Sequence, residues 1–328
     1  VRLRPQNGAR TVNFMSTSHG KPRSVEVSST LSSLESSDLS GHRSDQDHHL
    51  AVGGKVVRIV IAFAMTFACA LMPGVVALIP PLRSFAAAHP HPQGNTGDLA
   101  IGAFIVLVYG VATILALILC FVLRRSLDRG RSVRLRLQVD CRAMCWMAGM
   151  ILIAVAVELT VAGLIHALGL ASEGGAALDL PWWAMVVATL SQAFLLQAVP
   201  EETVWRGWLF SSLGETRCAA VSSVLGFTAV HLFSQGGQHN LLEHLTYLAG
   251  PCGFAVTALI VRMISGSTWA AIGVHGGFLV VNDALTDRLH LPVGSITWIL
   301  QGVIWAAVGL FILAFHRRRQ RLAALTGR

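Results

Sequence analysis

Long apolar stretches, separated by short polar ones, run through this chain from about residue 56 onward. An apolar run of about 18 or more residues is long enough to cross a membrane as a helix. Several runs reach that length, and together with the shorter ones they predict eight spans, at about residues 56–79, 99–123, 143–170, 182–201, 218–233, 241–264, 268–285 and 296–315. The pattern therefore predicts an all-α fold, a polytopic membrane helical bundle of about eight transmembrane helices.

The polar stretches divide the chain into regions. The first 55 residues include eleven serines between Ser16 and Ser44 and no sustained apolar run. Such a composition offers too little apolar surface to offset the entropy of folding. The loops at 80–98 and 171–181 are expected to be plain connections. We expect a disordered cytoplasmic tail at 1–55, N-terminal transmembrane helices at 56–181, the region that carries the candidate chemistry at 182–290, and the last helix with a basic tail at 291–328.

The composition is that of a membrane protein, and the positions of the arginines account for its net positive charge. Hydrophobic residues make up 53% of the chain, charged residues only 13%, and the net charge is +8. The arginines concentrate at 124–142 and 317–321, beside the ends of expected spans. Positive residues in that position mark the cytoplasmic side, so nucleic-acid binding is not needed to explain them. We expect an integral protein of the cell (plasma) membrane, in contact with the lipid bilayer, with both termini in the cytoplasm.

Three charged residues, Glu201, Glu202 and Arg206, stand between apolar segments. A charged side chain inside a membrane is unfavourable, so such residues indicate a functional site. On a helix Glu202 and Arg206 are four residues apart and can form an ion pair. Glu201 points about 100° away from Glu202 and lacks that partner. We therefore expect the Glu202–Arg206 pair to support the fold and Glu201 to be free for chemistry.

Pro200 directly precedes this group and predicts an interruption of the fourth span. Proline removes a backbone donor and so frees a carbonyl three or four residues earlier. Residues 201–213 are expected to form a further helical stretch, continuous with the span or turned back. A cavity open to the cytoplasm would bring Glu201 to the depth of residues on other spans. Trp205 and Trp208 are expected to be interfacial anchors or substrate contacts.

Two histidines on later spans, His231 and His275, complete the candidate site. A carboxylate in an apolar site can act as a base near neutral pH, and a histidine can share that role or carry the proton. A second histidine can donate to a developing oxyanion. Phe227, one turn before His231, is placed to pack against its ring. These groups suit the hydrolysis of a peptide bond.

The three motifs occur in a recognisable order. Glu201-Glu202-x-x-x-Arg206, then Phe227-x-x-x-His231, then His275 after Ser-Gly-Ser-Thr-Trp resembles the family of CAAX proteases and bacteriocin-processing enzymes, intramembrane proteases related to the Rce1 prenyl-protein protease. The resemblance covers about residues 182–290. It implies an endopeptidase that cleaves a membrane-associated protein or peptide. It also implies that Glu201 and His231 activate water, while His275 and an amide side chain stabilise the intermediate.

The third motif departs from the family pattern at one position. The family has Asn or Asp four residues after the histidine, whereas this chain has Leu279. The nearest amide beyond it is Asn282, which a regular helix places about 10 Å from His275 along the axis. Either Gly276 and Gly277 loosen the helix and bring Asn282 closer, or His275 acts alone. We expect the second, because an unwound helix exposes backbone groups that lipid cannot satisfy.

Other interpretations remain open. Glu201, His231 and His275 can also provide three ligands to a single divalent metal such as zinc, although no HExxH motif is present; otherwise no cofactor is expected. Leu279 is compatible with a non-enzymatic immunity or scaffold protein that keeps a degenerate protease fold. A transporter is a third class, since intramembrane charges also mark transport paths. Glu158 and His166 form a second polar pair, expected to be structural.

Overall fold

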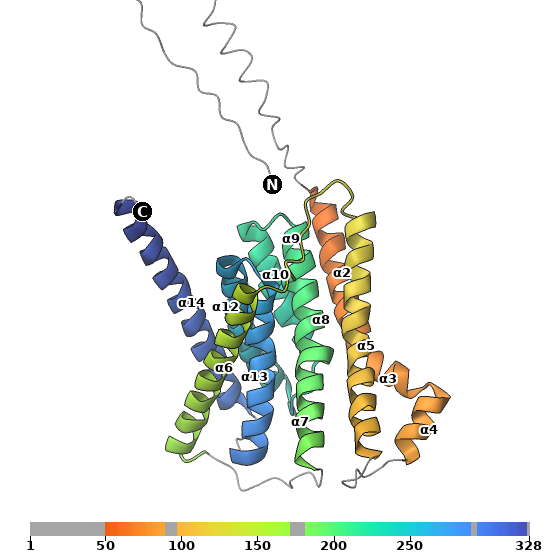
Figure 1. Ribbon diagram of the computed structural model, residues 1–328. Helices are drawn as coiled ribbons and strands as arrows, with labels where there is room; N and C mark the ends of the chain where they lie inside the picture. Colours follow the sequence, from red (N-terminus) through yellow and green to blue (C-terminus); the bar gives the residue numbers. More distant parts are fainter. Residues whose placement is uncertain (1–49, 89–96, 171–180, 290–293, 327–328) are drawn as a thin grey trace, which may run out of the picture. The chain divides into compact units, whose positions relative to one another are not determined.

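The computed structural model describes residues 50–88, 97–170, 181–289 and 294–326, and all regular elements within these ranges are helices (Figure 1). Most of the expected N-terminal tail lies outside the described residues. The elements are α2 Val52–Ala70, α3 Met72–Ala77, α4 Pro80–Ala88, α5 Gly97–Ser126, α6 Cys141–Ala167, α7 Trp182–Leu190, η1 Ser191–Ala198, α8 Val199–Glu202, η2 Thr203–Leu209, α9 Phe210–Ser212, α10 Arg217–Val230, η3 His231–Phe233, α11 Leu241–Tyr247, α12 Ala249–Ser265, α13 Thr268–Leu289 and α14 Ser295–Leu325.

Each of the eight expected spans corresponds to a helical segment. Among the described residues, six segments are long and apolar enough to cross a membrane: Val52–Ala77, Leu99–Ser126, Cys141–Ala167, Trp182–Ser212, Leu241–Ser265 and Ser295–Leu325. The chain is thus an all-α integral membrane protein, while the count of eight stays a prediction. The two segments outside the six, Arg217–Phe233 and α13, carry the candidate histidines.

The connection expected at 80–98 is wrong in its first half, because Pro80–Ala88 forms the short helix α4. Two prolines open this helix, at positions where their missing backbone N–H would be unpaired in any case. The histidines at 89 and 91 lie outside the described residues.

Small residues let two pairs of helices pack closely. Gly253 of α12 lies against the backbone of Gly302 on α14, and Gly273 of α13 lies against the backbone of Met147 on α6. Any side chain at either glycine would overlap the neighbouring helix. Such close backbone contact is a main source of helix association in membranes, where apolar burial between helices provides little drive. The result is a fixed position for α13, which contacts both α6 and α12.

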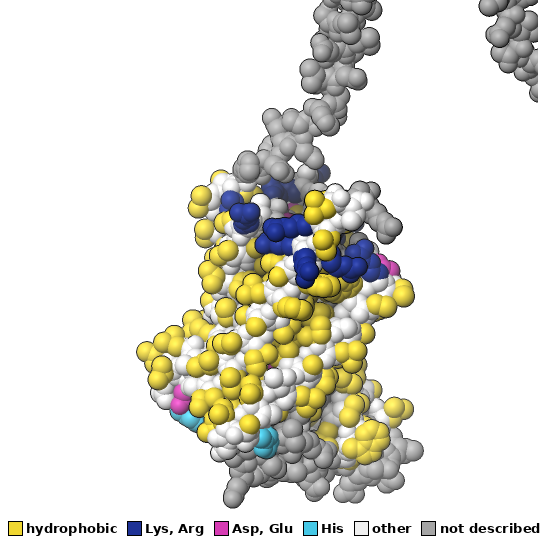
Figure 2. Space-filling model, turned by 90° about the vertical axis from the view of Figure 1, so that its left-hand side faces the viewer, with side chains coloured by type: hydrophobic (Ala, Val, Ile, Leu, Met, Phe, Trp, Pro, Cys, Tyr) yellow, Lys and Arg dark blue, Asp and Glu magenta, His cyan; other side chains and the backbone are white. Residues whose placement is uncertain are grey.

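The loop between α5 and α6, residues 127–140, is here called the basic loop, and it is hydrogen-bonded to the ends of neighbouring helices. The hydroxyl of Thr268, at the start of α13, donates to the Leu135 carbonyl at 2.7 Å. The amide N–H of Arg134 donates to the hydroxyl of Ser211, at the end of the 182–212 helix, over 3.0 Å. Figure 2 shows that Lys and Arg side chains gather toward one end of the face it draws. The start of α2 and the ends of α5 and α14 lie toward this end in Figure 1, here called the basic end.

Trp205 and Trp208 are neither interfacial anchors nor substrate contacts, so both expectations are wrong. Their side chains are fully buried. The indole N–H of Trp205 donates to the Thr66 hydroxyl at 3.0 Å, and that of Trp208 donates to the Asp128 carboxylate at 2.8 Å. Asp128 is also paired with Arg58 at 2.6 Å. The tryptophans therefore join the 182–212 helix to α2 and to the basic loop.

Candidate functional site

The expected interruption at Pro200 is absent, and one helical segment runs from Trp182 to Ser212. Two stretches of wider π-helix, Ser191–Ala198 and Thr203–Leu209, flank the turn that contains Pro200. In a π-helix a backbone N–H bonds to the carbonyl five residues earlier, so proline at 200 frees the carbonyl of Leu195. The hydroxyl of Thr113 on α5 donates to that carbonyl at 2.6 Å. The helix thus continues through Pro200, because the Thr113 hydroxyl replaces the backbone N–H that proline lacks.

This continuity also explains the depth of the site. Glu201 lies eleven residues before the helix ends at Ser212, a distance of about 16 Å at 1.5 Å per residue. His231 lies fourteen residues after Arg217, or about 21 Å from the same end. The two residues therefore come to similar depth without any turn-back of the chain.

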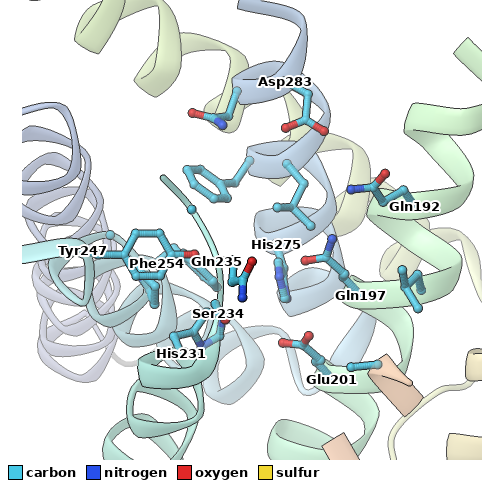
Figure 3. A pocket seen from close by; sticks show the side chains of 18 of the residues that line it. Gln192, Gln197, Glu201, His231, Ser234, Gln235, Tyr247, Phe254, His275 and Asp283 are labelled. Carbon is cyan, nitrogen blue, oxygen red and sulfur yellow. The ribbon is translucent and has the colours of Figure 1, made fainter. Parts of the chain in front are cut away.

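One cavity of about 1060 Å³ contains the three predicted catalytic residues. Glu201 comes from the 182–212 helix, His231 from the end of α10 and His275 from α13 (Figure 3). The remaining lining includes polar residues and aromatic rings: Thr66, Gln192, Gln197, Ser234, Gln235, Tyr247, Phe254, Asn282, Asp283, Trp298 and Gln301. Three polar side chains that are unfavourable inside a membrane thus line one cavity, each from a separate helical segment.

The two adjacent glutamates differ as the sequence predicts. Glu202 is fully buried, and its Oε1 accepts from Arg206 Nη1 at 3.0 Å. Glu201 faces the cavity, and its Oε2 has no hydrogen-bond partner among the described residues; Oε2 of Glu202 has none either, but Glu202 does not line the cavity. A buried carboxylate oxygen without a partner is uncommon and suits a group that binds a ligand or water. The expected Glu202–Arg206 ion pair is confirmed.

Glu202 has a second contact that the sequence did not predict. Its Oε1 also lies 3.1 Å from Nδ1 of His275. An ionised carboxylate only accepts hydrogen bonds, so Nδ1 of His275 carries the proton in this contact. The bond leaves Nε2 of His275 for the cavity. Glu202 therefore joins the buried arginine to a candidate catalytic histidine.

The Phe227 ring packs against both candidate histidines. It lies 4.7 Å from the His231 ring and 5.7 Å from the His275 ring, measured between centroids. The Arg206 guanidinium stands 4.2 Å from the centre of the same ring. The expected contact with His231 is confirmed, and one phenyl ring supports both histidines.

His231 is held through its own helix. Its Nδ1 lies 2.9 Å from the carbonyl oxygen of Phe227, four residues earlier. A carbonyl only accepts, so Nδ1 donates and Nε2 of the neutral ring is a free acceptor. In that tautomer His231 can take a proton from a water in the cavity.

Asn282 lines the same cavity but lies two turns from His275 on a continuous helix. Its Oδ1 accepts from Gln301 Nε2 at 2.8 Å, and Gln301 also donates to Glu158. Gly276 does not loosen the helix: a side chain there would overlap the ring of Phe194, so the glycine serves close packing. Asn282 therefore stays at the distance that a regular helix gives.

Glu158 does not form the expected pair with His166. Its carboxylate is fully buried and accepts from Gln301 and from the Trp305 indole at 2.8 and 2.9 Å. His166 is exposed near the end of α6. An eight-residue spacing leaves the two side chains more than two turns apart, which allowed these different surroundings.

Metal binding by Glu201, His231 and His275 gains no support from the geometry. Within the described ranges, no group of three or more His, Cys, Asp or Glu side chains is arranged to hold a metal ion. Both imidazoles direct Nδ1 toward protein acceptors. Each leaves Nε2 available to water, substrate or a metal ion, so the tautomers do not decide between these interpretations.

The cavity extends away from the basic end. On the 182–212 helix its lining residues lie between Met185 and Glu201, and on α13 they lie between His275 and Asp283. Ser212 and Thr268, at the other ends of these helices, are bound to the basic loop. The predicted cytoplasmic arginines and the predicted cytoplasmic opening of the cavity therefore cannot both be right.

Comparison with known proteins gives one match. Residues 179–281 match the family described as type II CAAX prenyl endopeptidase Rce1-like. The match contains Glu201, His231 and His275 and ends one residue before Asn282. No curated protein and no solved structure matches the chain.

Proposed function

We propose that this chain, which carries an Rce1-like domain of the type II CAAX prenyl endopeptidase family at residues 179–281, is an intramembrane endopeptidase. Its substrate is a membrane-associated protein or peptide. The observation that carries the proposal is a buried carboxylate oxygen without a partner, Oε2 of Glu201, on a residue that faces one cavity together with two histidines on separate helices.

The proposed reaction uses one water. Glu201 takes one proton of the water, with the free Nε2 of His231 accepting a hydrogen bond from the same water, as the water oxygen attacks the carbonyl carbon and the carbonyl electron pair moves to its oxygen. When the carbonyl re-forms, the carbon–nitrogen bond breaks and this proton passes to the leaving nitrogen. The second proton of the water leaves the new carboxylic acid, so the products are a carboxylate and a protonated amine.

His275 stabilises the oxyanion in this scheme. Because Nδ1 already donates to Glu202, Nε2 can donate as well only when the imidazole is protonated. The Glu202 carboxylate then lies between the Arg206 guanidinium and the His275 ring. A donor fixed before the reaction lowers the barrier more than a mobile one.

The activity can be sought without knowing the substrate. Membranes of cells that produce the wild-type chain should contain new protein termini that are absent with His231→Ala, because only the wild type can activate water. Mass spectrometry of protein termini measures this difference. Identical sets of termini with both chains, at equal protein levels, would favour the non-enzymatic scaffold, for which Leu279 is the supporting residue.

The orientation in the membrane is a separate prediction. If the basic end is cytoplasmic, as charge predicts, the cavity opens toward the opposite face. In a variant without native cysteines, Gln138→Cys in the basic loop should then resist a membrane-impermeant maleimide on intact cells. Trp182→Cys, at the far end of the 182–212 helix, should react with it. The reverse labelling pattern would place the cavity on the cytoplasmic side.

A further inference from the structure

No amide side chain stands one turn after His275 on α13. Leu279, one turn after His275, lines the cavity with an apolar side chain. Asn282 is two turns away, and its carbonyl oxygen is bound to Gln301. A tetrahedral intermediate in an apolar site nevertheless gains strongly from a second donor beside the imidazolium.

We propose that Gln197 provides this donor and is a catalytic residue of the site. The inference rests on the proposed endopeptidase function. Gln197 lies four residues before Glu201, so both side chains stand on the same face of the 182–212 helix. Figure 3 shows its carboxamide directed toward the ring of His275, with the Glu201 carboxylate beside them.

The state of the side chain suits this role. Gln197 is half-buried and lines the cavity, and the described residues give its carboxamide no hydrogen-bond partner. A carboxamide carries two N–H donors, and rotation about its last bond lets either end face the substrate. Its donors are therefore available for a ligand oxygen between Glu201 and His275.

The helix geometry explains why Gln197 stands here. It belongs to η1, the π-helical stretch before Pro200. Single π-helical turns are rare and occur frequently at functional sites. The freed carbonyl of Leu195 is bound to Thr113, which fixes this stretch to α5. Gln235, the other nearby amide, lies on a loop and is exposed, so it is the less well positioned donor.

The test compares substitutions at Gln197 with a rescue at Leu279. Gln197→Met keeps the volume but removes the donors. With a quenched peptide that ends in a farnesylated CAAX sequence, we expect kcat to fall by about 10²- to 10³-fold with little change in KM. Adding Leu279→Asn to Gln197→Met should recover at least about a tenth of the lost activity, because it restores an amide one turn from His275.

The controls separate this proposal from the proposed function. Gln320→Ala removes an exposed carboxamide outside the cavity and should leave kcat unchanged. Thermal unfolding of Gln197→Met should match the wild type. Two results would overturn the role of Gln197 if Glu201→Gln still shows its expected loss of kcat. One is a folded Gln197→Met variant with wild-type kcat; the other is a fall in kcat with Gln235→Ala in place of Gln197→Met. If the wild type cleaves neither this peptide nor its unprenylated form, the result contradicts the proposed endopeptidase function itself, and the role of Gln197 with it.

Discussion

Replacing Glu201 by Gln is expected to lower kcat by about 10²- to 10⁴-fold, the contribution of a positioned general base. The variant keeps the shape of the side chain and removes its ability to take a proton. The fold should tolerate the change, because Oε2 of Glu201 has no partner among the described residues. Cleavage of the quenched peptide by purified protein in liposomes measures the effect.

Glu243→Gln is the matched control, because Glu243 lies in the first turn of α11 outside the cavity. Its side chain accepts from the His239 N–H and the Asn240 amide, and the carbonyl oxygen of Gln can still accept one of these bonds. It should retain wild-type activity. Equal activity of Glu201→Gln and the wild type, at equal yield, would show that Glu201 is not the base.

Replacing Glu202 by Gln is expected to reduce the free energy of unfolding by about 3–5 kcal/mol, because the change leaves the buried charge of Arg206 unpaired. Expression and the midpoint of thermal unfolding should both fall. Turnover should also fall, since His275 loses the carboxylate that accepts from its Nδ1 and orients the ring.

A double variant separates these two effects. Glu202→Gln with Arg206→Met removes both charges, and an apolar replacement of a buried pair is often close to neutral for stability. The double variant should therefore recover much of the lost thermal stability but none of the turnover. Recovery of both would mean that Glu202 acts on the fold alone and does not position His275.

The sequence was sufficient to predict the helical class and to select three residues that line one cavity, Glu201, His231 and His275. Apolar runs located the helices because lipid requires continuous apolar surface. The four-residue spacing of Glu202 and Arg206 predicted their ion pair, which the structure contains at 3.0 Å. The same reasoning could not predict the bond from Glu202 to His275, because it joins helices 73 residues apart in the chain.

The predictions that were wrong concern places where the helix departs from regular α-helical geometry. A regular helix places Gln192 about 140° from Gln197, on a different face. Both line the cavity because η1 is a π-helix, a state that side-chain periodicity does not reveal. Pro200 was read as an interruption for the same reason. Its effect depends on Thr113, a residue of another helix that no local pattern connects to it.

The central claim is that Glu201 and His231 activate a water to hydrolyse a peptide bond. Cleavage in water enriched in ¹⁸O, followed by mass spectrometry of the peptide products, tests it most directly. We predict that the wild type places one ¹⁸O atom in the newly formed carboxylate, also in the presence of a zinc chelator, and that Glu201→Gln forms this product at least about 10²-fold more slowly. A wild-type chain that leaves both the farnesylated and the unprenylated peptide intact, or Glu201→Gln that cleaves at the wild-type rate, would refute this mechanism.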